Sequence, residues 1–244
     1  MGRDYGDDLA YIHDAGFGHF ARAGARALVD LVRRAGTTGG LVVDLGCGSG
    51  IGAQELCAAG FDVLGIDQSE AMIALARQRA PTATFRAGSF LTADLPPCVA
   101  VTAVGECFSY LFDRGNTDQR LTRLFRRIHA ALRPGGVLLF DVVGPGRVRG
   151  TSPQKGYWEG DGWAVFVELE EDRERRLLTR RITSFRRVGE LYRRDEEVHR
   201  QRLFRRPELA RQLREVGFRV RTLAGYGDLP FRRGQIGFLA RKPG

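Results

Sequence analysis

The chain has 244 residues, of which 43% are hydrophobic and 27% are charged, and its formal net charge is +9. This length suits one α/β domain with a subdomain. No apolar run approaches the roughly 18 residues that a membrane span needs, and the four cysteines form no CxxC pair. We therefore expect a soluble cytoplasmic protein with reduced thiols, no membrane segment, no signal sequence and no metal site.

Basic charge is concentrated in the second half of the chain. Seventeen arginines lie between Arg173 and Arg221, whereas the whole chain has only two lysines. Such a stretch could bind nucleic acid or an acidic substrate. Because acidic residues are interleaved with the arginines and few aromatic side chains lie among them, we interpret it as a solvated protein face.

The first 36 residues predict a leader and an amphipathic helix. Apolar residues recur at intervals of three and four between Gly18 and Arg34, which places them on one helical face. The leader before this helix contains Tyr5, Tyr11 and His13. Aromatic and histidine residues in such a segment usually pack against the core, although His13 is also a candidate for chemistry.

A glycine-rich turn follows the first predicted strand. The apolar run 41–45 indicates a strand buried on both faces, and Gly46, Gly48 and Gly50 supply a backbone that can bend sharply beside a ligand. After a helical segment, a second apolar run ends in Asp67, 23 positions after Asp44. A carboxylate at the end of the second strand can reach both hydroxyls of a ribose.

Three more buried strands are predicted before residue 145. They span residues 84–86, 99–104 and 137–143, and the strand 99–104 leads into the turn 105–110. Helical segments separate most of these strands, which favours a parallel sheet with a ligand crevice at the carboxyl ends of the strands.

The pattern changes after the fifth strand. Three segments alternate apolar and polar residues, at 163–169, 177–185 and 191–199, and predict antiparallel strands. A helix and two more strands follow. The predicted fold is α/β: a Rossmann-like, mostly parallel seven-stranded sheet with helices on both faces and an antiparallel β insertion. We predict four parts: a helical leader or cap (1–36), a cofactor-binding core (37–145), a β lid (146–204) and the completion of the core sheet (205–244).

The glycine spacing limits the kinds of cofactor that this turn can bind. The glycines fall as G-x-G-x-G-x-G through Gly52, whereas dinucleotide enzymes use G-x-G-x-x-G. Asp44 also precedes the turn directly, where its carboxylate would repel a pyrophosphate and suit a cation. A nicotinamide cofactor is therefore disfavoured.

The three core motifs together resemble the class I S-adenosylmethionine-dependent methyltransferases. Residues 43–50 resemble the first motif of that family, 65–69 its acidic second motif, and 132–136 the turn before its fifth strand. More loosely, residues 9–18 and the antiparallel insertion resemble the small-molecule branch, notably enzymes that dimethylate amino sugars.

This resemblance implies S-adenosyl-L-methionine as the cofactor and S-adenosyl-L-homocysteine as its product. Asp67 would hold the ribose hydroxyls, and Gln68 and Met72 would lie against the adenosine. The family usually has an acidic residue where this chain has Ser89, so the adenine amino contact would fall to a hydroxyl or a backbone carbonyl. The complete predicted cofactor site is Tyr11, Asp44, Gly46, Cys47, Gly48, Gly50, Asp67, Gln68, Met72, Gly88, Ser89, Phe90, Glu106, Cys107 and Phe108.

The resemblance further implies in-line methyl transfer to a small-molecule amine or hydroxyl. Tyr110 would face the acceptor, and the candidate catalytic residues are Tyr110, His13 and His199. Two alternatives stay open: an RNA methyltransferase that uses the arginine-rich half, and a non-catalytic module that binds the cofactor. The sequence also leaves open a homodimer.

Overall fold

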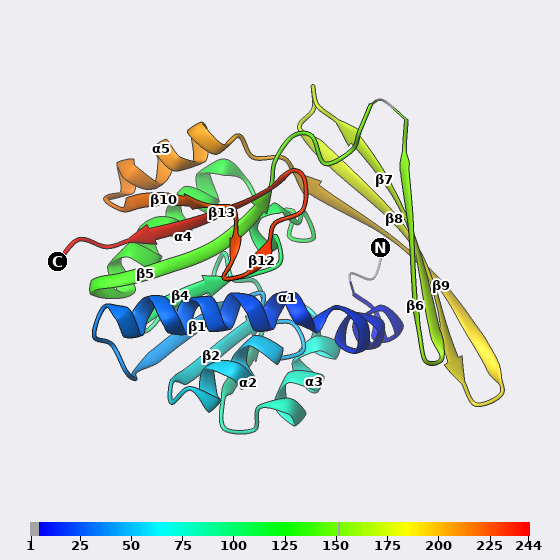
Figure 1. Cartoon of the computed structure of the whole chain (residues 1–244), viewed down its shortest axis with the longest axis horizontal. Coiled ribbons are helices and arrows are strands. Elements are labelled where there is room, and N and C mark those ends of the chain that lie inside the picture. The colour runs from blue at the N-terminus through cyan, green and yellow to red at the C-terminus, as the bar shows by residue number, and fades with distance from the viewer. Residues whose placement is uncertain (1–4, 151) are drawn as a thin grey trace.

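The main sheet has seven strands in the order β10-β13-β5-β4-β1-β2-β3 (Figure 1). In the computed structural model, which describes residues 5–150 and 152–244, β1, β2, β3, β4 and β5 run parallel, and β13 pairs antiparallel with both β5 and β10. The predicted fold class is confirmed. The strands are β1 (Leu41–Leu45), β2 (Asp62–Asp67), β3 (Thr84–Ala87), β4 (Cys98–Ala103), β5 (Leu132–Val143), β10 (Arg219–Leu223) and β13 (Gln235–Arg241).

Helices cover both faces of this sheet because its strands are apolar on both sides. Adjacent residues of β1 show the arrangement: Val43 belongs to one buried cluster and Val42 to another. The cluster around Val43 includes Leu124 of α4 and Leu213 of α5. The cluster around Val42 includes residues of α1, α2 and α3, on the other face. The helices are α1 (Asp7–Arg34), α2 (Ile51–Ala58), α3 (Glu70–Arg79), the short 3-10 helix η1 (Cys107–Ser109), α4 (Asp118–Ala131) and α5 (Arg206–Val216).

Helix α1 begins at Asp7, eleven residues before the predicted start at Gly18. Two acidic residues in its first turn complement the positive end of the helix dipole. The added turns bury Leu9 and Ile12 against Trp163 of a second sheet. Residues 7–17 are therefore helical, and this part of α1 extends past the main sheet to reach the insertion.

The insertion forms a four-stranded antiparallel sheet in the order β6-β7-β8-β9. It lies beyond the carboxyl end of β5, next to the N-terminal half of α1 (Figure 1). Three of its strands match the predicted alternating segments, and β6 was missed because its residues are largely exposed and show no apolar alternation. The strands are β6 (Gln154–Gly160), β7 (Trp163–Asp172), β8 (Leu177–Val188) and β9 (Leu191–Arg202); a small hairpin, β11 (Gly225–Tyr226) and β12 (Leu229–Pro230), precedes β13.

Across 5–150 and 152–244, no helix is both long and apolar enough to cross a membrane. The same residues contain no group of three or more histidine, cysteine, aspartate or glutamate side chains placed to hold a metal ion.

Candidate cofactor and acceptor site

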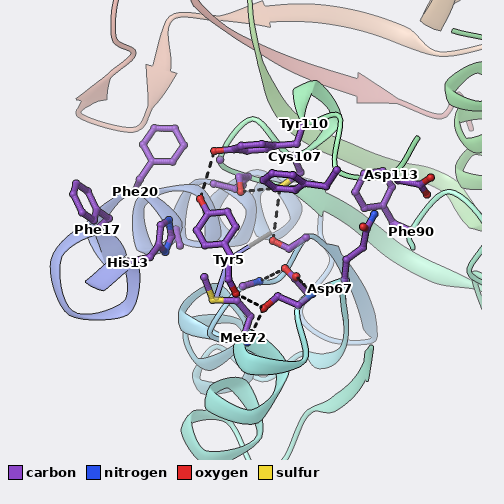
Figure 2. Close-up of a pocket in the computed structure, with 18 of the residues that line it drawn as sticks. Tyr5, His13, Phe17, Phe20, Asp67, Met72, Phe90, Cys107, Tyr110 and Asp113 are labelled. Carbon is purple, nitrogen blue, oxygen red and sulfur yellow. Dashed lines mark hydrogen bonds between the residues drawn. The ribbon is translucent and has the colours of Figure 1, made fainter. Parts of the chain in front are cut away.

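The glycine turn after β1 lines a cavity at the carboxyl end of the sheet. Figure 2 shows this cavity. Gly46 and Gly48 both have positive φ, 71° and 54°, which explains why the turn needs glycine. A Cβ on Gly46 would lie 2.5 Å from Cys107 Sγ, whereas a Cβ on Gly48 would meet nothing within 4 Å. The turn is therefore packed on one side and open beside the cavity.

Asp67 ends β2 and is fixed beside that turn. Its Oδ2 accepts a hydrogen bond from the Gly48 N–H at 2.9 Å, and its Oδ1 accepts one from the Ser69 N–H at 2.9 Å. Burial raises the pKa of Asp67, and these backbone donors oppose the rise. The carboxylate is thus held in one orientation while it lines the cavity together with Gln68 and Met72.

Asp44 is a buried carboxylate next to the same turn. Only 6% of the residue is exposed, and burial together with the charge of Asp67 raises the pKa of Asp44 to about 7. It lines a second, smaller cavity with Cys47, and this cavity shares Gly46, Gly48 and His13 with the first. A buried carboxylate of this kind suits a positively charged ligand group, which would restore its ionised form.

The opposite end of the main cavity is aromatic. Tyr5, His13, Phe17 and Phe20 come from the leader and α1, and Tyr110 faces them from the loop after η1 (Figure 2). Burial lowers the pKa of His13 to about 4, and among the described residues its Nδ1 has no hydrogen-bond partner. Burial also raises the pKa of Tyr110. Both side chains are therefore uncharged at neutral pH.

Tyr5 joins the leader to the rest of this aromatic wall. Its hydroxyl lies 3.4 Å from the Tyr110 hydroxyl, and its carbonyl accepts a hydrogen bond from Ser69 Oγ at 3.1 Å. The backbone N–H of Tyr5 donates to Glu197 Oε2, which also contacts His199 Nε2 at 2.7 Å. The Glu197–His199 pair of β9 thereby anchors Tyr5 over the cavity.

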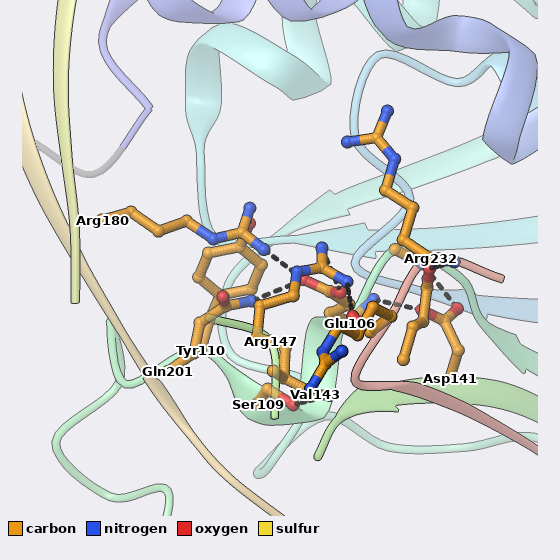
Figure 3. A network of polar contacts seen from close by, with 12 residues as sticks. Glu106, Ser109, Tyr110, Asp141, Val143, Arg147, Arg180, Gln201 and Arg232 are labelled. Atoms are coloured by element: carbon orange, nitrogen blue, oxygen red, sulfur yellow. Dashed lines mark hydrogen bonds and ion pairs between the residues drawn. The ribbon is translucent and has the colours of Figure 1, made fainter. Parts of the chain in front are cut away.

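Glu106 faces away from the cavity and toward the inserted sheet (Figure 3). It lies just after β4 with a φ of 65°, and its Oε2 accepts hydrogen bonds from Arg180 at 2.5 Å and Gln201 at 3.0 Å. Arg147 lies 3.0 Å from Oε1. Although burial acts to raise the pKa of Glu106, the two arginines hold it below its usual value. The sequence could not indicate these partners because they come from the insertion and its connection.

Several predicted site residues lie outside the main cavity. Tyr11 is 37% exposed, and its ring packs under the Arg186 guanidinium at 3.9 Å because it lies on the outer side of α1. Phe108 is in the core against Phe140, and Gly50 is the N-cap of α2 and packs against Ala76 of α3. The His199 ring packs edge-on against the Tyr110 ring and does not line the cavity.

The remaining predicted residues fall into two groups. Gly88 and Ser89 do not line the cavity. Ser89 donates a hydrogen bond to Asp113, which lines the cavity. The lining residues among those predicted are Gly46, Gly48, Asp67, Gln68, Met72, Phe90, Cys107, Tyr110 and His13. The cavity also contains Phe112 and Asp113, which sequence reasoning missed because nothing local marks a loop residue that folds back on a distant strand.

Sequence and structure comparisons agree with this arrangement. Residues 42–136, which contain the glycine turn, Asp67 and Cys107, match the model of a methyltransferase domain family. Residues 42–136 therefore form a methyltransferase domain, which agrees with the predicted class of enzyme and with S-adenosylmethionine as its cofactor.

Individual relatives cover different shares of the chain. YqeM of Bacillus subtilis, itself only provisionally named a methyltransferase, is 28% identical over 202 residues, which are 78% of each chain. Trans-aconitate 2-methyltransferase of Variovorax paradoxus is 41% identical over 105 residues, 41% of this chain and 38% of that protein. The solved structure of CalS10, an amino pentose methyltransferase from Micromonospora echinaspora, superposes with a TM-score of 0.76 over 99% of this chain and 100% of CalS10, at 23% identity. This last likeness establishes a shared fold.

Proposed function

We propose that the protein transfers a methyl group from S-adenosylmethionine to a small-molecule acceptor through an amine or hydroxyl of that acceptor. The observation that carries the proposal is the continuity of the main cavity. It extends from the fixed Asp67 carboxylate and the open side of Gly48 to the aromatic end formed by Tyr5, His13 and Tyr110. One end suits a nucleoside and the other suits a small organic acceptor.

The residues present fit the cofactor at three points. Asp67 would hold the ribose hydroxyls, the turn at Gly46 and Gly48 would lie along the methionyl portion, and Asp44 would face a positive charge. The raised pKa of Asp44, about 7, supports the last assignment because a bound cation stabilises the ionised carboxylate. When bound, S-adenosylmethionine supplies an activated sulfonium methyl group that an acceptor lone pair can take by in-line displacement.

The chain's contribution to the reaction is mainly orientation and exclusion of water. Phe17, Phe20 and Phe112 line the cavity and would keep water from the reacting atoms. Holding two reactants in line is worth about 7–11 kcal/mol in well-aligned cases. The protein can therefore accelerate transfer without a strongly basic side chain.

The candidate catalytic groups fit a positioning role. His13 has a pKa of about 4 and is neutral at pH 7, so its ring can accept a hydrogen bond but is a weak proton acceptor. Tyr110 keeps its proton at neutral pH and can donate to or accept from the acceptor. An amine that arrives with a free lone pair suits these groups better than a hydroxyl, which would need a general base.

The arginine-rich half offers little support for a nucleic-acid substrate. Arg180 is paired with buried Glu106, and Arg176 binds Glu208 through two nitrogens. Arg193 and Arg186 both contact Asp8 of α1. These guanidinium groups hold the insertion to the core, which favours a small-molecule acceptor.

Labelled methyl transfer tests the proposal. The protein is incubated with S-adenosylmethionine that carries a tritiated methyl group, and with panels of small amines, hydroxyl compounds, total RNA and DNA. We expect labelled product in a small-molecule panel, with an amine preferred. Label found only in nucleic acid, or binding of the cofactor without transfer to any acceptor, would contradict the proposal and support one of the two alternatives.

A further inference from the structure

The loop between η1 and α4 places a carboxylate against the end of β3. Ser89 Oγ donates a hydrogen bond to Asp113 Oδ2 at 2.5 Å, and the Gly115 N–H donates to Asp113 Oδ1 at 2.6 Å. Ser89 Oγ in turn accepts a hydrogen bond from the Leu91 N–H at 3.1 Å. The Asp113 side chain is thus held in place by groups 24 residues apart in sequence, and it lines the main cavity (Figure 2).

Asp113 keeps unused capacity to accept hydrogen bonds, unlike its polar neighbours. An ionised carboxylate offers about four acceptor positions, and the described residues occupy two of them. The Ser89 proton is committed to Asp113. The Asn116 amide donates to the Phe108 and Tyr110 carbonyls, and its oxygen accepts from Arg202. Asp113 is therefore able to receive a proton donor from a ligand at this end of the cavity.

The position of Asp113 relative to Asp67 suits the two ends of an adenosine. β2 and β3 pair in register at Asp67 and Ala87, and the Gly88 N–H donates to the Asp67 carbonyl at 2.8 Å. Ser89 therefore follows directly from the strand beside Asp67. The cavity is also lined by Phe90, which lies beside Asp113, and by Met72; both are apolar and suit the faces of a purine ring (Figure 2).

We propose that Asp113 accepts a hydrogen bond from the exocyclic amino group of adenine and selects adenine over purines with an oxygen at that position. This inference rests on the proposed function, because it assumes that the ribose lies at Asp67. A carboxylate only accepts hydrogen bonds, so it attracts an amino group and repels a carbonyl oxygen. Ser89 supports the carboxylate and does not itself contact the base.

Isothermal titration with two product nucleosides tests the inference without any need for turnover. The probes are S-adenosylhomocysteine and S-inosylhomocysteine, which differ at the purine 6 position. The wild-type chain should bind the adenosine compound about 10- to 100-fold more tightly, the range expected for one hydrogen bond to a charged group. Asp113→Asn keeps the size of the side chain and can present either a donor or an acceptor, so it should bring the two affinities within about threefold of each other.

Three further variants separate recognition from folding. Asp161→Asn removes a carboxylate that is 97% exposed on the turn before β7 and should leave both affinities unchanged. Ser89→Ala should weaken both ligands by a similar factor while keeping the preference for adenine. The exchange of Ser89→Asp with Asp113→Ser should restore the preference, since it returns a carboxylate to the same end of the cavity.

The outcomes distinguish this inference from the proposed function. If the wild-type chain binds neither nucleoside, the proposed function fails and the role of Asp113 fails with it. If the wild-type chain binds S-adenosylhomocysteine and Asp113→Asn keeps the full preference for it, the proposed function stands and the role of Asp113 is overturned.

Discussion

Tyr5 of the leader is hydrogen-bonded to Glu197 of the inserted sheet: the Tyr5 N–H donates to Glu197 Oε2 at 2.9 Å, across 192 positions of sequence. The neighbouring Gly6 N–H donates to the other carboxylate oxygen at 3.0 Å. Glu197 is only 7% exposed, and both bonds are partly buried. The leader therefore closes over the site through a strand of the insertion.

Removing Glu197 should loosen this closure. The leader lines the cavity through Tyr5, so a loosened leader should admit and release an adenosine cofactor more readily. In Glu197→Gln, which weakens both charged hydrogen bonds, stopped-flow binding of S-adenosylhomocysteine should show association and dissociation both faster by about 3- to 10-fold. Glu196→Gln on the exposed side of β9 is the matched control, and equal rates in both variants would refute the closure.

The raised pKa of Asp44 predicts how cofactor binding depends on pH. The methionyl ammonium of S-adenosylhomocysteine is positive throughout the range from pH 6 to pH 8, whereas Asp44 changes from largely neutral to largely ionised around its pKa of about 7. Affinity should therefore rise with pH in this window by about tenfold. Titrations of Asp44→Asn at the same pH values should show a flat profile, and a rise that persists in that variant would assign the dependence to another group.

The same pKa carries a consequence for stability. The folded pKa of Asp44 lies above its unfolded value of about 3.9, so between pH 4 and 7 the folded chain binds more protons than the unfolded chain. The free energy of unfolding should then fall as pH rises through this window. In Asp44→Asn this contribution is absent, so urea denaturation should show a shallower decrease than in the wild type. An unchanged slope would contradict the assignment.

The ion pair between Glu106 and Arg180 should be essential for docking the insertion. Its side chains are only 6% and 19% exposed, respectively. Removing one partner of a buried pair costs about 3–5 kcal/mol when the remaining charge is left without a partner. Glu106 would keep Arg147 at 3.0 Å, so Arg180→Met should lower the free energy of unfolding by about 1.5–3 kcal/mol, the contribution of hydrogen bonds to a charged group.

An exposed pair provides the comparison for that measurement. Arg194 and Glu196 are 55% and 60% exposed, and surface pairs of this kind contribute about 0–1 kcal/mol. Arg194→Met should thus change the unfolding free energy by less than 1 kcal/mol. If the two variants lose equal stability, the buried pair has no special role.

The core of the fold could be predicted because its signals are local. The apolar run 41–45, the glycine turn and the carboxylate at Asp67 each follow from neighbouring residues, and short loops bring them together at one edge of a parallel sheet. In the structure the Gly48 N–H donates a hydrogen bond to Asp67. No distant segment had to be placed to find them.

The surroundings of the cavity depend on distant segments and were harder to predict. Glu106 faces Arg180 because the insertion folds back on the end of β4, and the sequence gives no register for that contact. Tyr11 lies on the outer face of α1, a fact that periodicity reveals only when the helix is started at Asp7. Asp113 reaches the end of β3 through a loop that carries no apolar pattern.

The most direct test of the central claim is the affinity of S-adenosylhomocysteine for Asp67→Ala, measured by isothermal titration against the wild type. Loss of hydrogen bonds to a charged group should weaken binding by about 1.5–3 kcal/mol, or roughly 10- to 150-fold. Asp62→Ala, at the exposed start of the same strand, should bind as the wild type does. Unchanged affinity in Asp67→Ala, or an equal loss in both variants, would contradict the assignment of this cavity to the cofactor.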